Sequence, residues 1–422
     1  MDKAVTSTKE LSISASARAK AEFAGYVLIF GIWLRGFLPG AINFLTDSHY
    51  STEGLTQIDR SQASQMTSTA TQVFLILCIT YIFTLKSTRR INLFRLLVVF
   101  AIVLLNYLPT AVNGLLTMSQ ALNFVLLLAV ALAILRISWS RSHFVFFAYL
   151  GLFVIVYSLL LGVFLPQLAS FPGLAKNFLG TFLLAGSFGH ANTLGLASLL
   201  IVGFFSIIPQ SSIRIAALSI ATVGLVWSGS RTAFLAAILI AFFAVLRQTN
   251  LSKRFVTLVT SLIVGFLCVA VPLLTADYEA FTRRGRIWMV SLEEVGHSIL
   301  LGLGPDWYEL QALYATDLGT QASSGHNLFV HVFTTGGVVL VALVLYLFGL
   351  TGPKVFQGSF FEKPYSFWMV SFLAISIAEY AFVYSVHSDL FFFTTFPLLL
   401  FFLNASKPND AKYQSEVQTL SS

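Results

Sequence analysis

The sequence predicts an all-α polytopic membrane protein, with about twelve transmembrane helices and a long external loop. Composition, apolar segments and charge distribution all point to this class. The 422 residues are 57% hydrophobic and 10% charged, with a mean hydropathy of +0.82. A soluble protein could not bury so much apolar surface. The net charge of +7 is expected mainly in cytoplasmic loops, so nucleic-acid binding is not predicted.

Apolar segments of roughly 20 residues, the length needed to cross a bilayer, recur along the chain. They lie near residues 23–45, 70–86, 92–110, 117–135, 143–165, 191–209, 213–229, 230–246, 254–274, 326–350, 366–386 and 389–404. We divide 213–246 at Ser228, Gly229 and Ser230, because Arg231 at the bilayer centre would cost at least about 2.5 kcal/mol. Residues 23–404 would therefore form one transmembrane domain. The polar residues 1–22 and 405–422 are expected to be cytoplasmic tails, and 1–22 lack the apolar centre of a signal peptide.

The basic residues predict which end of the helices faces the cytoplasm. With twelve spans, 18 of the 25 Lys and Arg residues lie on the side of the termini, six lie on the other side, and Arg35 lies within the first span. Basic residues concentrate in cytoplasmic loops, so both termini are expected there. The loops 46–69, 166–190 and 275–325 would then be external. The last should begin with an amphipathic helix and break near Gly302.

Several external cations are not explained by topology and lie near His326 in the predicted arrangement. Arg231 follows a Ser-Gly-Ser turn at a helix N-terminus, whose free N–H groups attract anions. Its guanidinium could bind a phosphate in a bidentate manner. The run from Thr282 to Arg286 holds three more guanidiniums, on Arg283, Arg284 and Arg286. Alternatively, Arg231 is an interfacial anchor and the run binds anionic lipid head groups.

His326 and Asn327 are expected at the start of the segment 326–350. The dipole of a helix disfavours a protonated imidazole at its N-terminus, so His326 should be neutral and able to accept a proton from a hydroxyl. A histidine at this place can also serve only to cap or pack the helix. We therefore regard His326 as a candidate catalytic base whose role depends on its neighbours.

Glu379 is a carboxylate within the apolar segment 366–386 and needs a partner or a water-filled cavity. We expect it to pair with an outer arginine or to orient His326. A structural hydrogen bond between helices, or pairing with Arg35, is the alternative. His190 and Asn192, at the external start of 191–209, are further candidates for a positioning role, as is Asn327.

No spacing of His, Cys or carboxylate residues is typical of a metal site, and no nucleotide-binding motif is present. An enzyme of this kind would use arginine rather than a metal ion to balance phosphate charge. Neither a metal nor a cofactor is therefore expected.

Four stretches of the chain resemble the O-antigen ligase and O-antigen polymerase superfamily of bacterial membrane glycosyltransferases. They are Gly186–Asn192, similar to the family's Gly-x-Phe-x-Asn-Pro-Asn opening; Ser228–Ala233, similar to its Ser-Arg-Gly-Ala turn; Arg284–Gly304, similar to its Arg, Trp and Gly-x-Gly stretch; and Gly325–Gly337, similar to its His-Asn helix entry. His190 and Ala191 depart from the usual Asn-Pro. The resemblance covers residues 186–345 and leaves open whether Arg284 or Arg286 is the family arginine.

This resemblance implies a GT-C-like glycosyltransferase of the bacterial cytoplasmic (inner) membrane, with an outward-facing site, that makes lipopolysaccharide or another cell-envelope polysaccharide. Its donor would be a glycan on undecaprenyl diphosphate. Arg231, Arg284 and Arg286 would hold the diphosphate, and His326 would activate an acceptor hydroxyl. The acceptor is a lipid A–core sugar in the ligases and a lipid-linked repeat unit in the polymerases.

The residues do not separate ligase from polymerase, and they name neither the sugar nor the oligomeric state. A flippase for lipid-linked sugars is the alternative from another functional class. Transporters place charges along a path near the midplane, often between internal repeats, whereas these charges gather at one end of the predicted helices. A non-catalytic partner in a glycan-assembly machine is the third possibility.

Overall fold

The computed structural model describes residues 15–47, 61–85, 92–172, 182–313, 318, 324–351 and 359–404. Within these ranges the regular elements are helices, apart from two short antiparallel strands, β1 (Ser170–Pro172) and β2 (Phe182–Leu184). The chain is an all-α membrane protein, as predicted. The predicted tails lie outside the described residues, except that residues 15–22 belong to the first helix.

Seven of the described helices are long and apolar enough to cross a membrane. They are α1 (Ala15–Asp47), α2 (Gln62–Thr84), α3 (Leu93–Val112), α4 (Met118–Arg136), α5 (Arg141–Phe164), α10 (Lys253–Leu274) and α13 (Leu328–Leu350). Four apolar helices are shorter, namely α7 (Ala191–Phe205), α8 (Ser211–Trp227), α9 (Arg231–Leu246) and α15 (Thr395–Asn404). Every predicted segment contains a helix, but the described residues support seven full spans by length and composition rather than twelve.

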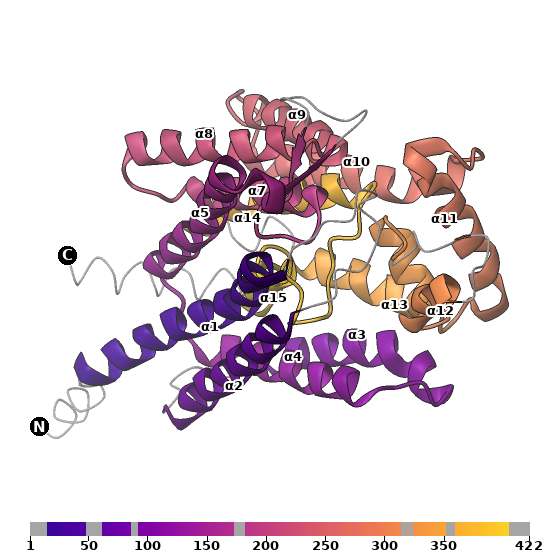
Figure 1. Cartoon of the computed structure of the whole chain (residues 1–422), viewed down its shortest axis with the longest axis horizontal. Helices are drawn as coiled ribbons and strands as arrows, with labels where there is room; N and C mark the ends of the chain where they lie inside the picture. The colour runs from indigo at the N-terminus through magenta and orange to yellow at the C-terminus, as the bar shows by residue number, and fades with distance from the viewer. Residues whose placement is uncertain are drawn as a thin grey trace, which may run out of the picture.

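The remaining helices of the described residues are four short or loop elements and the buried helix α14. They are α6 (Pro166–Ala169), α11 (Ala280–Val295), the 3-10 turn η1 (Gly296–Ser298), α12 (Asp306–Leu313) and α14 (Glu362–Ser376). In Figure 1, α11 and α12 lie at the end of the molecule opposite the start of α1. The predicted amphipathic helix of the long loop therefore corresponds to α11, whereas α12 was not predicted.

The helix predicted at 366–386 is wrong in its second half, and the one at 389–404 begins later than expected. α14 and α15 are separated by residues 377–394, which form turns and extended chain. Irregular backbone is tolerated in apolar surroundings only when its polar groups have partners. Asn327 donates to one carbonyl of this segment at 2.8 Å. Asn123 donates to a second at 3.1 Å and accepts from a backbone N–H at 2.9 Å. These side chains replace the hydrogen bonds of a continuous helix.

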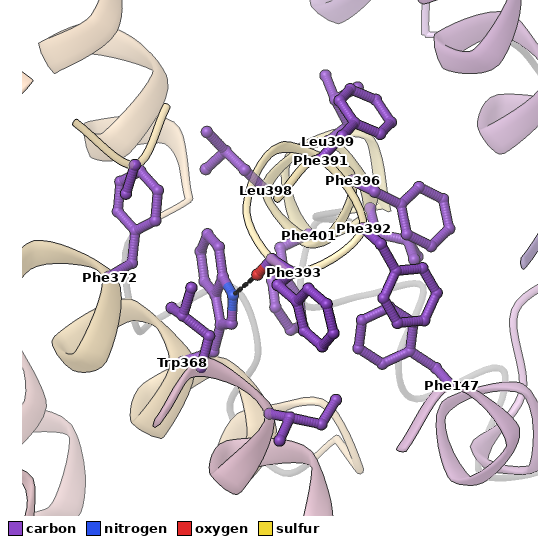
Figure 2. Close-up of a cluster of buried hydrophobic side chains, with 14 of the residues drawn as sticks. Phe147, Trp368, Phe372, Phe391, Phe392, Phe393, Phe396, Leu398, Leu399 and Phe401 are labelled. Atoms are coloured by element: carbon purple, nitrogen blue, oxygen red, sulfur yellow. Dashed lines mark hydrogen bonds between the residues drawn. The ribbon is translucent and has the colours of Figure 1, made fainter. Parts of the chain in front are cut away.

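An aromatic core holds the segment 377–394 in place (Figure 2). Rings from its end and from α15, among them Phe392 and Phe401, pack between α14 and Phe147 of α5. All three rings are at most 2% exposed. The indole N–H of Trp368 in α14 donates to the carbonyl oxygen of Phe393 at 3.0 Å. The packing and the hydrogen bond fix a segment that does not form a continuous helix.

The predicted division of residues 213–246 is confirmed. α8 ends before the Ser-Gly-Ser turn and α9 begins at Arg231 after it. Gly229 has a φ of +62°, a backbone conformation that favours glycine. Ser230 is the N-cap of α9, because its hydroxyl accepts a hydrogen bond from the N–H of Ala233 at 3.3 Å. The turn therefore places Arg231 and Thr232 at the N-terminus of α9.

α13 is broken near its middle, where Gly337 has φ +64° and ψ −167°. The predicted glycine turn of the long loop docks at this break. The N–H groups of Leu303 and Gly304 donate to the carbonyl oxygens of Thr334 and Thr335 at 2.7 and 3.0 Å. These bonds satisfy carbonyls that the broken helix leaves without helical partners. The break thus joins the long loop to the helix that follows His326.

Candidate functional site

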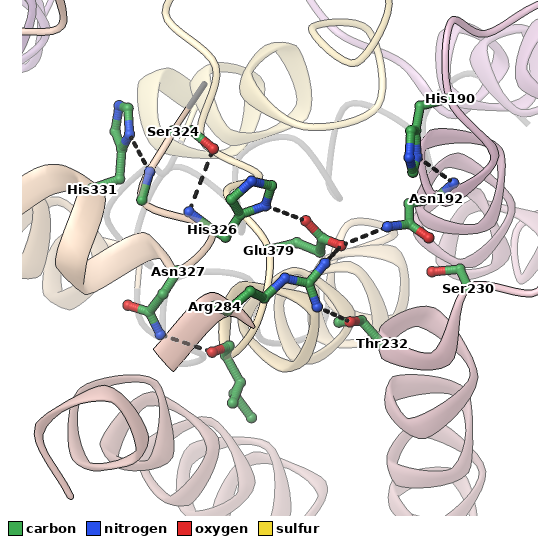
Figure 3. Close-up of polar contacts among 12 residues, drawn as sticks. His190, Asn192, Ser230, Thr232, Arg284, Ser324, His326, Asn327, His331 and Glu379 are labelled. Carbon is green, nitrogen blue, oxygen red and sulfur yellow. Dashed lines mark hydrogen bonds and ion pairs between the residues drawn. The ribbon is translucent and has the colours of Figure 1, made fainter. Parts of the chain in front are cut away.

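Glu379 lies at the centre of a polar cluster drawn from four separate stretches of the chain (Figure 3). Its side chain is 9% exposed. One carboxylate oxygen accepts from Arg284 and, at 3.1 Å, from the side-chain amide of Asn192. The other oxygen accepts from Nδ1 of His326 at 3.2 Å. Both partners expected for Glu379, an outer arginine and His326, are therefore in contact with it.

The partners of Glu379 decide the protonation state of this carboxyl. Burial alone would raise the pKa of Glu379, but the hydrogen bond from His326 and the charge of Arg284 lower it below its usual value. Glu379 is therefore a carboxylate near neutral pH. It can neutralise the Arg284 guanidinium and orient the His326 ring at the same time.

Arg284 is held at both ends of its guanidinium. One terminal nitrogen contacts Glu379, and the other donates to the hydroxyl of Thr232 at the start of α9, at 3.3 Å. Residues 281–283 have φ values of 53°, 62° and 69°, so the chain makes a left-handed turn immediately before Arg284. A Cβ atom on Gly285 would lie 2.0 Å from the carbonyl oxygen of Asp277, so only glycine fits there. This local geometry sets the direction in which Arg284 points.

The three arginines of this run point in different directions. Residues two apart on a helix are rotated by roughly 200°, so Arg284 and Arg286 cannot face the same way. The Arg284 side chain is 16% exposed and lies in the cluster, whereas Arg286 is exposed. Arg283 is also exposed and pairs with Glu279 at 3.3 Å. The structure places Arg284 rather than Arg286 against Glu379.

His326 is positioned by its neighbours in the chain. Its φ of +44° is unusual for a residue other than glycine and turns the side chain toward Glu379. Asn327 caps α13 by accepting from the N–H of Val330 at 2.9 Å, and its amide donates to the carbonyl oxygens of Cys268 and Ile377. Asn327 therefore ties the backbone beside His326 to the segment that carries Glu379.

Trp288 connects the same histidine to Arg284. It lies one turn after Arg284 in α11, is fully buried, and donates from its indole N–H to the carbonyl oxygen of Gly325 at 2.9 Å. The residue before His326 is thus fixed to the helix that presents Arg284. This bond limits movement of the backbone beside His326 relative to α11.

His190 and Asn192 form the side of the cluster contributed by α7. His190 is the N-cap, because its Nδ1 accepts from the N–H of Asn192 at 3.0 Å. The Asn192 amide reaches Glu379. The stretch Gly186–Asn192, which departs most from the resembled motif, is therefore joined to the cluster. Asn192 contacts Glu379 directly, and His190 contacts Asn192.

Arg231 lies beside the cluster, next to Thr232, and is exposed. No hydrogen bond among those described for Glu379 comes from Arg231. Its position at the N-terminus of α9 agrees with the helix start predicted from the sequence. The role of Arg231 in binding a phosphate remains a prediction.

Arg35 is not the partner of Glu379, so that alternative is wrong. Arg35 is 3% exposed within α1 and contacts Nδ1 of His387 in the segment before α15. Its charge is accommodated by this separate polar contact. The sequence could not show this, because residues 377–394 were expected to be largely helical.

Thr232 and the packing around His331 were not predicted. His331 is buried, its ring stacks on Tyr380 at 3.5 Å and on Tyr308 at 5.4 Å between centroids, and its Nδ1 accepts from the N–H of Gly325. Burial raises the pKa of Tyr308 to about 12. In the sequence, Thr232 is marked only by its place after Arg231, and His331 only by its place one turn after Asn327. Neither position indicates which residue the side chain contacts in the folded protein.

Among the described residues, no group of three or more His, Cys, Asp or Glu side chains is arranged to hold a metal ion. The cluster instead combines a guanidinium, a carboxylate and an imidazole. Such a set can bind an anion and transfer a proton.

Residues 215–347 match the family model described as O-antigen ligase. This part of the chain is similar to O-antigen ligases. The match confirms the resemblance drawn from the sequence and includes Arg231, Thr232, Arg284 and His326. It covers 133 of the 422 residues, so Asn192 and Glu379 lie outside it although they contact residues inside it. No curated protein and no solved structure matches the chain.

The match to the O-antigen ligase family model and the apolar helices together indicate a bacterial membrane protein whose residues 215–347 form a domain similar to O-antigen ligases. The functional cluster is assembled between this domain and its flanks. α7 precedes the matched residues and the segment after α14 follows them. The domain alone would therefore lack the carboxylate that joins Arg284 to His326.

Proposed function

We propose that the protein transfers a glycan from undecaprenyl diphosphate to an acceptor hydroxyl at the external face of the cytoplasmic membrane, as an O-antigen ligase. The observation that carries this proposal is the bridge made by Glu379 between Arg284 and His326. A cation that can bind a leaving diphosphate is thereby held next to a base that can deprotonate a nucleophile.

The arginines supply the charge that the leaving group needs. When the bond between the anomeric carbon and the diphosphate oxygen breaks, negative charge grows on that oxygen. Fixed guanidiniums stabilise this charge. Arg284 retains further N–H donors beyond those that contact Glu379 and Thr232, because a guanidinium has five. Arg231, which adjoins Thr232, and Arg286, two residues after Arg284, are both exposed. They would contact the rest of the diphosphate.

His326 is the proposed general base. Its Nδ1–H donates to Glu379, which leaves the Nε2 lone pair to accept a proton. The carboxylate fixes this tautomer and stabilises the imidazolium that forms, as in other carboxylate–histidine pairs. The buried hydrogen bonds of Asn327 and Trp288 hold the ring in position.

The reaction forms one bond and breaks one. The acceptor oxygen attacks the anomeric carbon from the face opposite the diphosphate, its proton passes to Nε2 of His326, and undecaprenyl diphosphate leaves. The configuration at the anomeric carbon is inverted. The charge balance needs no metal ion if the arginines perform it.

Incubation of the purified protein with a labelled undecaprenyl-diphosphate glycan tests this function. We expect release of undecaprenyl diphosphate and transfer of label to a lipid A–core acceptor, unchanged by a chelator. Transfer only to a second lipid-linked glycan would identify a polymerase instead. Vesicles in which the labelled lipid changes leaflet without release of undecaprenyl diphosphate would contradict the proposal and favour a flippase.

A further inference from the structure

Four cationic side chains converge at the ends of α8, α9, α10 and α14 that lie away from the candidate site. They are Arg214, Arg247, Lys253 and Lys363. α9 carries Thr232 of the site at its first turn and Arg247 directly after its last, so the two places are separated by the length of that helix, roughly 24 Å. The cationic cluster is therefore at the opposite end of α9 from the site, and the predicted topology assigns that end to the cytoplasmic surface.

Arg247 is the fixed centre of this cluster. Its side chain is 9% exposed, donates to the hydroxyl of Thr257 at 3.2 Å, and pairs with Glu362 at 3.5 Å. Its guanidinium also lies over the rings of Phe243 and Phe367. A guanidinium held in this way cannot move to avoid neighbouring cations.

The cations around Arg247 repel one another. Desolvation lowers the pKa of Lys363, and the charges of Arg214, Arg247 and Lys253 lower it further. Within this set, four cations and the single carboxylate of Glu362 leave three positive charges. Such an arrangement is unfavourable without an anion, because like charges at short range raise the free energy of the fold.

Other basic side chains at the same end of the helices are used differently. Arg95, Arg136 and Arg141 each donate to backbone carbonyl oxygens at or just beyond the C-terminal ends of neighbouring helices, at 3.0, 2.7 and 3.0 Å. The binding of these carbonyl oxygens gives the three arginines a structural role. Within the described residues, the side chains of Arg214, Lys253 and Lys363 donate to no such carbonyl oxygen.

Exposed apolar side chains lie next to the cationic cluster. Ile215 in α8, and Phe255 and Leu258 in α10, are 62%, 56% and 42% exposed. They follow Arg214 and Lys253 by one to five residues, so they lie within about one and a half turns of these cations along the same helices. Cations at the membrane surface above exposed apolar side chains match the two parts of a phospholipid, a phosphate head group and acyl chains.

We propose that Arg214, Arg247, Lys253 and Lys363 form a binding site for the head group of an anionic phospholipid. The bound lipid would neutralise the cluster and join α8, α10 and α14. This site is independent of glycan transfer, so it stands or falls without the proposed function.

The test is a titration of the purified full-length protein in non-ionic detergent with phosphatidylglycerol, phosphatidylcholine or inorganic phosphate. Bound lipid is counted by native mass spectrometry, and thermal unfolding is followed in parallel. Each cation near such a head group contributes about 1 kcal/mol, or about fivefold in affinity. Lys363→Gln should therefore weaken phosphatidylglycerol binding about fivefold, and the triple variant Arg214→Gln/Lys253→Gln/Lys363→Gln about a hundredfold.

Lys20→Gln is the matched control, because Lys20 is an exposed lysine of α1 outside the cluster. It should bind phosphatidylglycerol as the wild type does. The proposal is overturned if phosphatidylcholine binds as tightly as phosphatidylglycerol, if Lys20→Gln weakens binding as much as Lys363→Gln, or if inorganic phosphate alone gives the full thermal shift. Because the single variant is measured too, misfolding of the triple variant would not prevent a decision.

Discussion

At the residue scale, one carboxylate organises the candidate site. Glu379 accepts from Arg284, Asn192 and His326, and each comes from a different helix or loop. A buried carboxylate with cationic and amide donors is stable only while those donors remain in place. The same contacts that stabilise Glu379 therefore hold the proposed base and the proposed phosphate ligand at a fixed separation.

Replacing Glu379 with Gln should lower the rate of glycan transfer by about tenfold or more, up to the roughly 10⁴-fold seen in other carboxylate–histidine pairs. Rates of glycan transfer by Glu379→Gln and by Glu309→Gln, an exposed carboxylate of α12 used as the control, test this.

An unchanged transfer rate in Glu379→Gln would mean that His326 does not depend on this carboxylate. An equal loss of rate in Glu309→Gln would mean that the effect is a general one of surface charge.

Arg231→Lys distinguishes a phosphate ligand from an interfacial anchor. A lysine keeps the charge but not the planar fork that binds phosphate oxygens in pairs. We expect a clear loss of transfer in both Arg231→Lys and Arg231→Gln, with normal amounts of folded protein. Near-normal turnover of the lysine variant would show that only the charge matters.

At the element scale, the break in α13 is the joint between the long loop and the helix that begins after His326. Gly337 has a backbone conformation that is essentially confined to glycine. A Cβ atom there would lie 2.3 Å from backbone atoms of Leu300. The loop can dock only because this position has no side chain.

Gly337→Ala should therefore lower the free energy of unfolding by about 2 kcal/mol or more. Gly349→Ala is the control in the same helix, because nothing lies within 4 Å of the place its Cβ would take. Thermal unfolding of both variants in detergent measures the difference. Equal melting temperatures would show that the loop does not need the break.

The sequence was sufficient to predict the start of α9 but not the end of α14. Ser228 to Ser230 predicted the turn before α9 because glycine and a capping serine are local signals. The end of α14 could not be predicted, because residues 377–394 are as apolar as a helix of the core. Their irregular path depends on hydrogen bonds from Asn123 and Asn327, which lie far away in the sequence.

The choice between Arg284 and Arg286 was likewise beyond local pattern. It depends on the left-handed turn at residues 281–283, which sets the rotation of α11. By contrast, the polar character of Glu379 in an apolar stretch was enough to predict that it needs a charged partner. Local chemistry thus indicated which residues matter, and long-range packing decided which of them meet.

At the scale of the whole molecule, the topology follows from the distribution of basic residues and remains a prediction. α11 and α12 are expected outside and the starts of α8 and α10 inside. The two native cysteines, Cys78 and Cys268, are buried, so they should react little with a labelling reagent. Single cysteines at Glu294 and Ser211, both exposed and at opposite ends, can therefore report the orientation.

An impermeant thiol reagent added to intact spheroplasts should label Glu294→Cys and should leave Ser211→Cys unlabelled until the membrane is opened. Labelling of Ser211→Cys from outside would reverse the topology. The proposed site would then face the cytoplasm.

The most direct test of the central claim compares the wild type with His326→Ala in two assays on the same preparations. One follows transfer of a labelled glycan from undecaprenyl diphosphate, and the other follows binding of that donor. If His326 is the general base and the arginines hold the diphosphate, transfer should fall by about 10²–10⁴-fold while donor binding is kept. Wild-type transfer by His326→Ala would contradict the account, and so would loss of donor binding, which would make His326 a phosphate ligand rather than a base.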